Sequence, residues 1–220
     1  MNTDVEYNAA VIDYETLDIT PWSCVVLDVG VVLFNTKHIH SFQELVDNGF
    51  HMKFAVEHQV STLKRVISPD TLEWWNKQGA SAKEILIPSS SDRNLLDFAE
   101  SFESYLKRNQ VNQFKMKLYA RGSSFDITIL RSIYQAIYGI TYDNALPFRY
   151  WNERDVRTRI ETFVDEDLKK IPVDKNLLKG FVKHNSIHDC AKDVIAMQVA
   201  RQISFHGIPA NLNIDDCELV

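Results

Sequence analysis

The feature that most constrains the fold is a pair of apolar segments near the amino terminus. Residues 9–16 have the sequence AAVIDYET, and residues 23–34 form the longer, valine-rich run SCVVLDVGVVLF. Apolar, β-branched runs of this length predict buried β-strands. Residues 18–21 can supply the turn between them, so we expect the two segments to pair as an antiparallel hairpin within a sheet.

Strand and helix signals alternate along the rest of the chain. Three further strands are expected, over residues 51–56, 116–121 and 148–155. Helices are expected over residues 68–75, 89–106, 122–139, 156–170 and 186–205. This order predicts an α/β domain with a mixed sheet, in which the first strands are antiparallel and the later ones are joined through helices.

Local signals mark where several of these helices begin. Ser68 followed by Pro69 is typical of a helix amino terminus. Two pairs, Ser89 with Asp92 and Ser186 with Asp189, have the spacing of a capping box, in which each side chain accepts a backbone N–H of the first turn. The acid at 189 therefore has an ordinary structural explanation.

Length and composition favour one domain. The chain has 220 residues, of which 45% are apolar, and no Gly/Ser-rich or Pro-rich linker is visible. We therefore expect a single domain over residues 1–220, with a core over about 9–206 and a carboxyl-terminal tail over 207–220.

Cysteine usage and hydropathy predict a cytoplasmic protein with no membrane association. The cysteines are three in number and form no CxxC pair, so neither a disulfide framework nor a thiolate zinc site is indicated. The amino terminus lacks a basic region followed by an apolar stretch, and Asp28 interrupts the most hydrophobic run.

The charge balance excludes one class of nucleic-acid protein. A net charge of −6 argues against a protein that coats nucleic acid through many phosphate contacts, but it is compatible with one that grips a strand end. Residues 105–121 are locally basic and contain no acid. A solvated basic face and a phosphate path explain this stretch equally well.

Asp13 and Glu15 are the first candidate functional residues. They are separated by one residue on an expected strand, so their side chains leave the same face roughly 7 Å apart. Two carboxylates about 4 Å apart repel by about 4 kcal/mol at an effective dielectric of 20. The pair therefore either shares a cation or lies at a frayed strand end facing water.

Three more polar residues are unremarkable when taken singly. Asp126 is expected in the first turn of a helix, where a carboxylate interacts with the helix dipole. Asp193 would be an ordinary exposed helical acid, and His188 a hydrogen-bonding residue near a helix terminus.

Taken together, these five residues resemble the pattern of a known enzyme family. Asp13 and Glu15, then Asp126 in a SFD turn, then His188 followed after four residues by Asp193, is an arrangement similar to that of the DnaQ-like, or DEDDh, 3′-to-5′ exonucleases. The segments IDYETL, TLEWWNKQ, GSSFDITIL, WNERDVRTRIE and GFVKHNSIHDCAKD resemble phage exodeoxyribonucleases of this family over nearly the whole chain.

The resemblance implies a ribonuclease H-like fold, with a central mixed five-stranded sheet and helices on both faces. It implies that Asp13, Glu15, Asp126 and Asp193 hold two divalent metals and that His188 is the general base. Hard oxygen ligands favour Mg²⁺ or Mn²⁺ over zinc.

Three residues are weaker candidates for substrate binding. The resemblance implies that Leu17, just past Glu15, contacts the terminal base. Trp74 could stack on a base, and Arg157 or Arg154 could bind a phosphate. Loop packing, a half-buried helical tryptophan and a salt-bridged helix start are the ordinary alternatives. For the neighbouring pair Trp74 and Trp75, one core and one half-buried residue is the commoner outcome.

The implied activity is a 3′-to-5′ exodeoxyribonuclease that releases nucleoside 5′-monophosphates from single-stranded DNA. A 3′-to-5′ exoribonuclease with the same site is the first alternative, and a non-catalytic nucleic-acid-binding module is the second. DNA is favoured over RNA as the partner, and a homodimer stays open because related exonucleases include monomers and dimers. A phage protein of this kind would act in the host cytoplasm.

Overall fold

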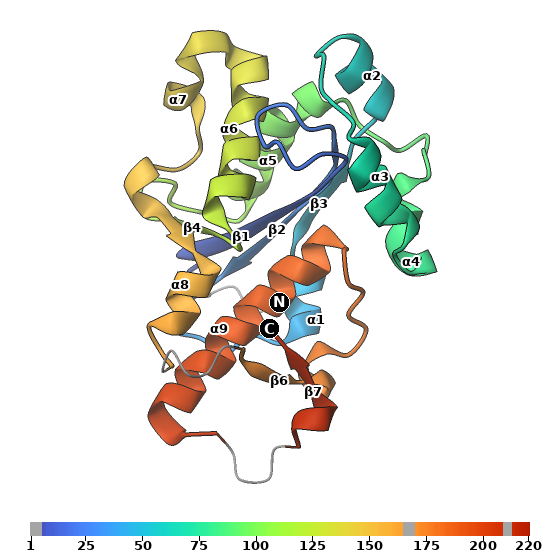
Figure 1. The fold of residues 1–220 in the computed structure, drawn as a ribbon. Coiled ribbons are helices and arrows are strands. Elements are labelled where there is room, and N and C mark those ends of the chain that lie inside the picture. The colour runs from blue at the N-terminus through green and yellow to red at the C-terminus, as the bar shows by residue number, and fades with distance from the viewer. Residues whose placement is uncertain (1–5, 165–169, 209–212) are drawn as a thin grey trace.

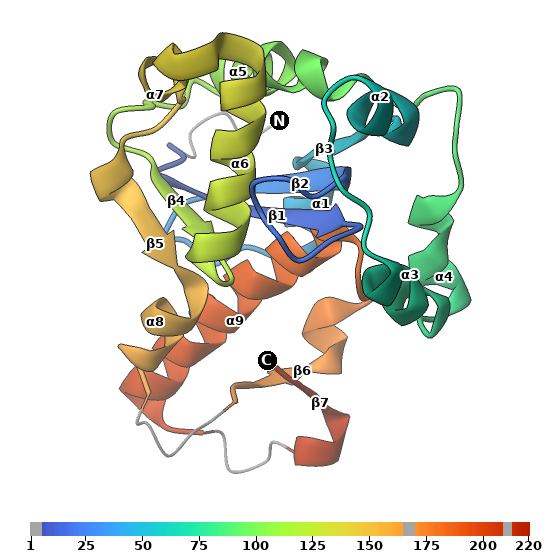
Figure 2. The ribbon, with the colours of Figure 1, turned by 45° about the horizontal axis from the view of Figure 1, so that its top comes forward.

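A five-stranded mixed sheet forms the centre of the protein. The computed structural model describes residues 6–164, 170–208 and 213–220. The strand order is β3-β2-β1-β4-β5 (Figures 1 and 2), with bounds Ala9–Thr16 for β1, Val26–Phe34 for β2, Phe50–Lys53 for β3, Lys117–Ala120 for β4 and Glu153–Asp155 for β5. Strand β2 pairs antiparallel with both β1 and β3, whereas β4 pairs parallel with β1 and β5 pairs parallel with β4. This is the predicted mixed sheet.

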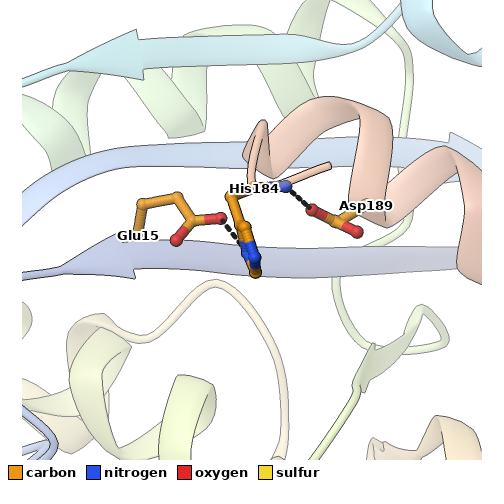
Figure 3. Close-up of side chains that lie close together, drawn as sticks. All are labelled: Glu15, His184 and Asp189. Atoms are coloured by element: carbon orange, nitrogen blue, oxygen red, sulfur yellow. Dashed lines mark hydrogen bonds and ion pairs between the residues drawn. The ribbon is translucent and has the colours of Figure 1, made fainter. Parts of the chain in front are cut away.

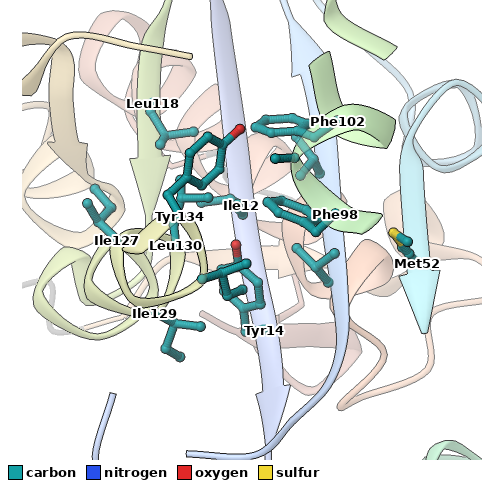
Figure 4. Packing of buried hydrophobic residues seen from close by; sticks show 14 of the residues in the cluster. Ile12, Tyr14, Met52, Phe98, Phe102, Leu118, Ile127, Ile129, Leu130 and Tyr134 are labelled. Carbon is teal, nitrogen blue, oxygen red and sulfur yellow. The ribbon is translucent and has the colours of Figure 1, made fainter. Parts of the chain in front are cut away.

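Helices cover both faces of the sheet. Helices α5 (Phe98–Arg108) and α6 (Ser123–Tyr138) pack on one face, and α9 (Ser186–His206) crosses the other, beside α1 (Phe42–Asp47) and α8 (Val156–Glu161) (Figures 1 and 2). The first face holds the larger apolar cluster, in which Ile12 and Tyr14 meet the aromatic side chains of α5 (Figure 4). Because both faces are covered, all nine residues of β2 are buried.

Strand β1 sends its side chains alternately to the two faces. Ala10, Ile12 and Tyr14 belong to the cluster under α5 and α6, whereas Ala9 and Val11 belong to the cluster under α9. The two-residue period of a strand therefore directs Asp13 and Glu15 to the α9 side.

Strand β1 also extends beyond its neighbour β4. The two strands pair only from Ala9 to Val11, so the carboxyl-terminal half of β1 has no strand partner on that side. Crevices at the carboxyl ends of parallel strands are the usual ligand sites of α/β sheets.

The remaining elements surround this sheet. Helices α2 (Val56–Ser61), α3 (Pro69–Asn76) and α4 (Ala80–Lys83) with η1 (Glu84–Leu86) follow β3, and η2 (Leu95–Asp97) leads into α5. The elements η3 (Gly139–Thr141), α7 (Tyr142–Ala145) and η4 (Tyr150–Asn152) connect α6 to β5. A two-stranded sheet pairs β6 (Pro172–Asp174) with β7 (Cys217–Leu219), each flanked by a 3₁₀ turn, η5 (Lys175–Leu178) and η6 (Ile214–Asp216). Among the described residues, no helix is long and apolar enough to span a membrane.

Several boundaries differ from the prediction. The second strand begins at Val26, three residues later than expected. The third strand covers residues 50–53 instead of 51–56, because helix α2 already begins at Val56. The helix expected over 156–170 ends at Glu161, and residues 165–169 lie outside the described part. The end of the expected tail forms β7, which pairs with β6.

Two of the three predicted helix starts were wrong in detail. Ser68 caps α3 by accepting the Thr71 N–H, as predicted. Ser89 and Asp92 exchange hydrogen bonds in a turn, but α5 begins later, at Phe98. Helix α9 is capped by Asn185, one residue before the predicted Ser186, because the Asn185 side chain accepts the His188 N–H.

Candidate active site

The predicted acids lie in one region, where β1 extends beyond β4, because, besides burial, the charges of Asp126, Glu15 and Asp193 each raise the pKa of Asp13. Asp126 lies in the first turn of α6 and is 3% exposed, and its Oδ1 accepts the Tyr14 N–H at 3.3 Å. Gly122, at φ +91°, allows the chain to turn from β4 directly into α6. The Asp126 carboxylate therefore occupies the open edge of β1 beside Asp13.

Helix α9 brings the fourth acid from the opposite face. Asp193 is 4% exposed, and its helix packs against β1 and β2. The approach is close: a Cβ on Gly30 would lie 2.4 Å from Ile187 N, and the Cys190 Sγ donates to Gly30 O at 3.2 Å. Gly30 is the register partner of Asp13, so the first turns of α9 are held directly over that acid.

Burial and mutual repulsion raise the pKa values of these carboxyl groups. Desolvation, followed by the charge of Asp126, holds the pKa of Asp13 well above its usual range. Burial raises the pKa of Asp126 to about 8 and that of Glu15 well above its ordinary value. These buried carboxyl groups offer only oxygen ligands, and without a nearby positive charge their ionised forms are unfavourable. A hard divalent cation fits such a site, because it prefers oxygen ligands and would supply that positive charge.

One cation of the protein already contacts this cluster. Arg121, the residue after β4, donates from Nε to Asp193 Oδ1 at 2.8 Å. Burial raises the pKa of Asp193, and the Arg121 charge opposes that rise. The sequence placed Arg121 only within a basic stretch, since nothing in the local sequence indicates a partner 72 residues away.

His188 lies in the first turn of α9. Its ring packs edge-on against Phe42, with centroids 5.4 Å apart, and its Nδ1 accepts the Val182 N–H at 3.0 Å. A neutral imidazole that accepts at Nδ1 carries its hydrogen on Nε2. Burial lowers the pKa of His188, which favours this neutral form.

A second histidine, absent from the predicted site, lies beside Glu15. The His184 Nδ1 is 3.9 Å from Glu15 Oε1, and the His184 N–H donates to Asp189 Oδ2 at 2.9 Å (Figure 3). One ligand atom from each of these three residues lies within 4.8 Å of the others. His184 has φ +59°, a left-handed conformation that is uncommon outside glycine. Asp189 thus fixes the loop before α9 instead of forming the predicted capping box with Ser186.

Asp155 fixes the loop that precedes Asp126. Its Oδ2 accepts the N–H groups of Gly122 and Ser123 at 2.9 and 3.1 Å, and its Oδ1 caps α8 by accepting the Thr158 N–H at 3.0 Å. Arg157 lies over the same loop, because its Nη1 would be 3.0 Å from a Cβ placed on Gly122. The charge of Arg157 also lowers the pKa of Asp126.

The two apolar candidates differ in what they offer a substrate. Leu17 is 5% exposed and packs with Val25, Leu27 and Trp75, so its burial favours loop packing over contact with a base. Trp75 is 1% exposed and Trp74 is 42% exposed, which matches one core and one half-buried residue. The Trp74 ring lies edge-on to His184, with centroids 4.8 Å apart, and therefore borders the site.

Sequence comparison yields two matches. The profile of the 3′-5′ exoribonuclease Rv2179c-like domain matches residues 8–200. An exodeoxyribonuclease of Enterobacteria phage T4 is 35% identical to this chain, in an alignment that covers 94% of this chain and 95% of the phage protein.

Solved structures share the fold. The nuclease domain of 3′hExo, a DEDDh family member bound to rAMP, matches with a TM-score of 0.55 at 15% identity over 96% of this chain and 99% of that chain. Escherichia coli exonuclease I in complex with a dA16 oligonucleotide matches with a TM-score of 0.53 at 13% identity, over 87% of this chain. This chain spans about 40% of the length of the exonuclease I chain.

Proposed function

Because the chain belongs to the DnaQ-like 3′-5′ exonucleases, with the Rv2179c-like domain covering most of its length, we propose that it degrades single-stranded DNA from the 3′ end. The products would be nucleoside 5′-monophosphates. The observation that carries the proposal is the convergence of acids from three distant segments, in which Asp126 hydrogen bonds to β1 beside Asp13 and Asp193 approaches from α9.

Asp13, Glu15, Asp126 and Asp193 would hold two divalent cations, Mg²⁺ or Mn²⁺. When bound, such cations stabilise the charge that develops on a phosphate during in-line displacement and activate the attacking water. The raised pKa values of the acids support this assignment, because carboxyl groups that repel one another in a buried site are stabilised by a shared positive charge. Metal binding should accordingly release protons.

His188 would accept the proton of the attacking water. In the present arrangement its Nδ1 accepts from Val182, so the ring carries a hydrogen on Nε2 and presents no free nitrogen there. We therefore assign the base function to a ring that has rotated away from the Val182 N–H, with a bare nitrogen facing the water. Its lowered pKa keeps the imidazole neutral and able to accept a proton near neutral pH.

Two side chains at the rim would bind the strand. Arg157 is exposed and lies over Gly122, close enough to Asp126 to affect its pKa, so its guanidinium can bind a phosphate near the reacting centre. Trp74 is half-exposed beside His184 and Glu15, which suits stacking on a terminal base. The resemblance gave Leu17 a similar role, but its burial leaves little surface for a base.

An exoribonuclease is the second candidate, favoured by the description of the matching domain profile. DNA is preferred here because the phage T4 relative, 35% identical over 94% of this chain, is an exodeoxyribonuclease. Monophosphate release from DNA and RNA strands of the same sequence, each labelled at the 3′ end, distinguishes the two. Faster release from RNA would overturn the DNA assignment.

The substitution Asp126→Asn tests the site itself, since it removes one ligand charge without changing the size of the side chain. We expect release from 3′-labelled single-stranded DNA to fall by at least about 100-fold, while circular dichroism stays unchanged. The exposed acid Asp143 in α7 provides the matched control Asp143→Asn, which should retain full activity. Undiminished hydrolysis by Asp126→Asn would remove the basis of the two-metal assignment.

A homodimer stays a prediction to be checked by light scattering. Because the matching relative is a phage protein, we expect the host cytoplasm to be the site of action.

A further inference from the structure

Arg121 contacts the acid cluster, and the proposed chemistry gives it no role. Its Nε donates to Asp193 Oδ1 at 2.8 Å, and the two side chains are 24% and 6% exposed. A second cation, Lys192, is engaged elsewhere, because its Nζ lies 2.5 Å from Asp189 Oδ1. Lys192 still lowers the pKa of Asp193 from there, but Arg121 is the cation that contacts the Asp193 carboxylate directly.

The guanidinium is only partly satisfied. The Nη2 atom of Arg121 is buried and has no hydrogen-bond partner among the residues that the structure describes. An unpaired buried donor costs free energy that a fully engaged structural arginine would not incur. The pairing with Asp193 therefore leaves Nη2 without an acceptor, and a different side-chain conformation of Arg121 could supply one.

The backbone around Arg121 is fixed, so any change must come from its side chain. Asp155 accepts the N–H groups of the next two residues, Gly122 and Ser123. The preceding residue, Ala120, is in register with Asp155 in the sheet. A long arginine side chain on an anchored backbone can leave one carboxylate without disturbing the strand or helix α6.

We infer that Arg121 is an internal counter-ion that holds Asp193 in the metal-free protein and is displaced from it when a divalent cation binds. The inference rests on the proposed role of Asp193 as a metal ligand. A guanidinium and a metal ion beside the same carboxylate repel each other, so the two compete. By linkage, removing the guanidinium must strengthen metal binding.

Mn²⁺ binding without substrate tests this competition. The dissociation constant is measured from the electron paramagnetic resonance signal of free Mn²⁺ for the wild type, Arg121→Gln and Arg131→Gln. Arg131 is the matched control, because its side chain is also 24% exposed and pairs with an acid, Glu153, that is not a proposed ligand. We expect Arg121→Gln to bind Mn²⁺ about tenfold more tightly, equivalent to about 1.4 kcal/mol, and Arg131→Gln to bind like the wild type.

The outcomes separate the two proposals. If Arg121→Gln binds Mn²⁺ as tightly as the wild type or more weakly, the inference is overturned but the proposed function is not. Arg121 would then not compete with the metal for Asp193. If neither the wild type nor Arg131→Gln binds Mn²⁺, the proposed function fails and the inference fails with it.

If Arg121→Gln does not fold, a second measurement on the wild-type protein still tests the inference. The Nε–H resonance of Arg121, assigned with Arg121→Lys, should shift when Mg²⁺ replaces the guanidinium on Asp193. A resonance that saturating Mg²⁺ leaves unmoved would contradict displacement.

Discussion

Gly30 is the point where the sheet and the helix that carries Asp193 come closest. A Cβ at this position would lie 2.4 Å from both Ile187 N and Ser186 C, about 1 Å inside ordinary contact at 3.4 Å. These are backbone atoms, so no side chain can rotate away. In Gly30→Ala, the first turn of α9 must therefore move outward from β2 by about 1 Å.

This movement should impair both stability and catalysis. Overpacking of this kind costs about 1–3 kcal/mol. For a chain of this size, each kcal/mol lowers the melting temperature by about 2–4 °C, so we expect a fall of roughly 2–12 °C. Because α9 carries His188 and Asp193 while Gly30 is paired with Asp13, the same shift separates the acids. A misplacement of about 1 Å can lower a catalytic rate by about 100-fold.

The assay combines calorimetry with single-turnover release of a 3′-terminal nucleotide from single-stranded DNA. Gly79→Ala is the matched control, because a Cβ there meets nothing within 4 Å and its φ is −62°. We expect that control to keep its rate and melting temperature. Wild-type hydrolysis and melting by Gly30→Ala would refute the argument that this contact sets the position of α9.

Further predictions follow from other parts of the site. Replacing Asp155 by alanine removes the acceptor for the Gly122 and Ser123 N–H groups and the cap of α8, so we expect at least about 1 kcal/mol of destabilisation by thermal unfolding and at least about tenfold slower hydrolysis; an unaltered rate would argue against a positioning role. His188→Ala should slow hydrolysis by roughly 100-fold or more while Mn²⁺ affinity stays the same, and a full rate would reduce His188 to a structural residue. Burial raises the pKa of Asp126 to about 8, so in metal-free buffer with EDTA the folded state binds the proton of this carboxyl group more tightly than the unfolded state does. The contribution of this group to stability is therefore present in acid and is lost as pH rises from about 4 through about 8, so the melting temperature of the wild type relative to Asp126→Asn should fall between pH 5 and pH 8; a constant difference would contradict the shift.

Local sequence patterns determined the main elements of the fold. The valine-rich run at 23–34 predicted a buried strand, which the structure contains from Val26 to Phe34. The order of strand and helix signals predicted the mixed α/β sheet that is also present. The acids were identifiable in the same way, since Asp13 and Glu15 share a strand face by period alone. Exact helix starts were less determined, because Asn185 and Ser186 are adjacent and both are good caps, and in the structure Asn185 accepts the His188 N–H.

Gly30 is an isolated glycine within an apolar strand, and this is a local signal that the sequence contains. A glycine there suggests close approach of another backbone, and the structure shows α9 in that place. The signal could not have identified which segment approaches.

Only the tertiary structure decided which residues far apart in the chain contact one another. Arg121 meets Asp193, Asp155 holds the loop before Asp126, and His184 lies against Trp74 and Glu15. Spacing along the chain encodes which side chains share a strand face or a helix turn, because those distances are set by the backbone period. Contacts between separate elements depend on how the sheet twists and where each helix docks, and no local period carries that information.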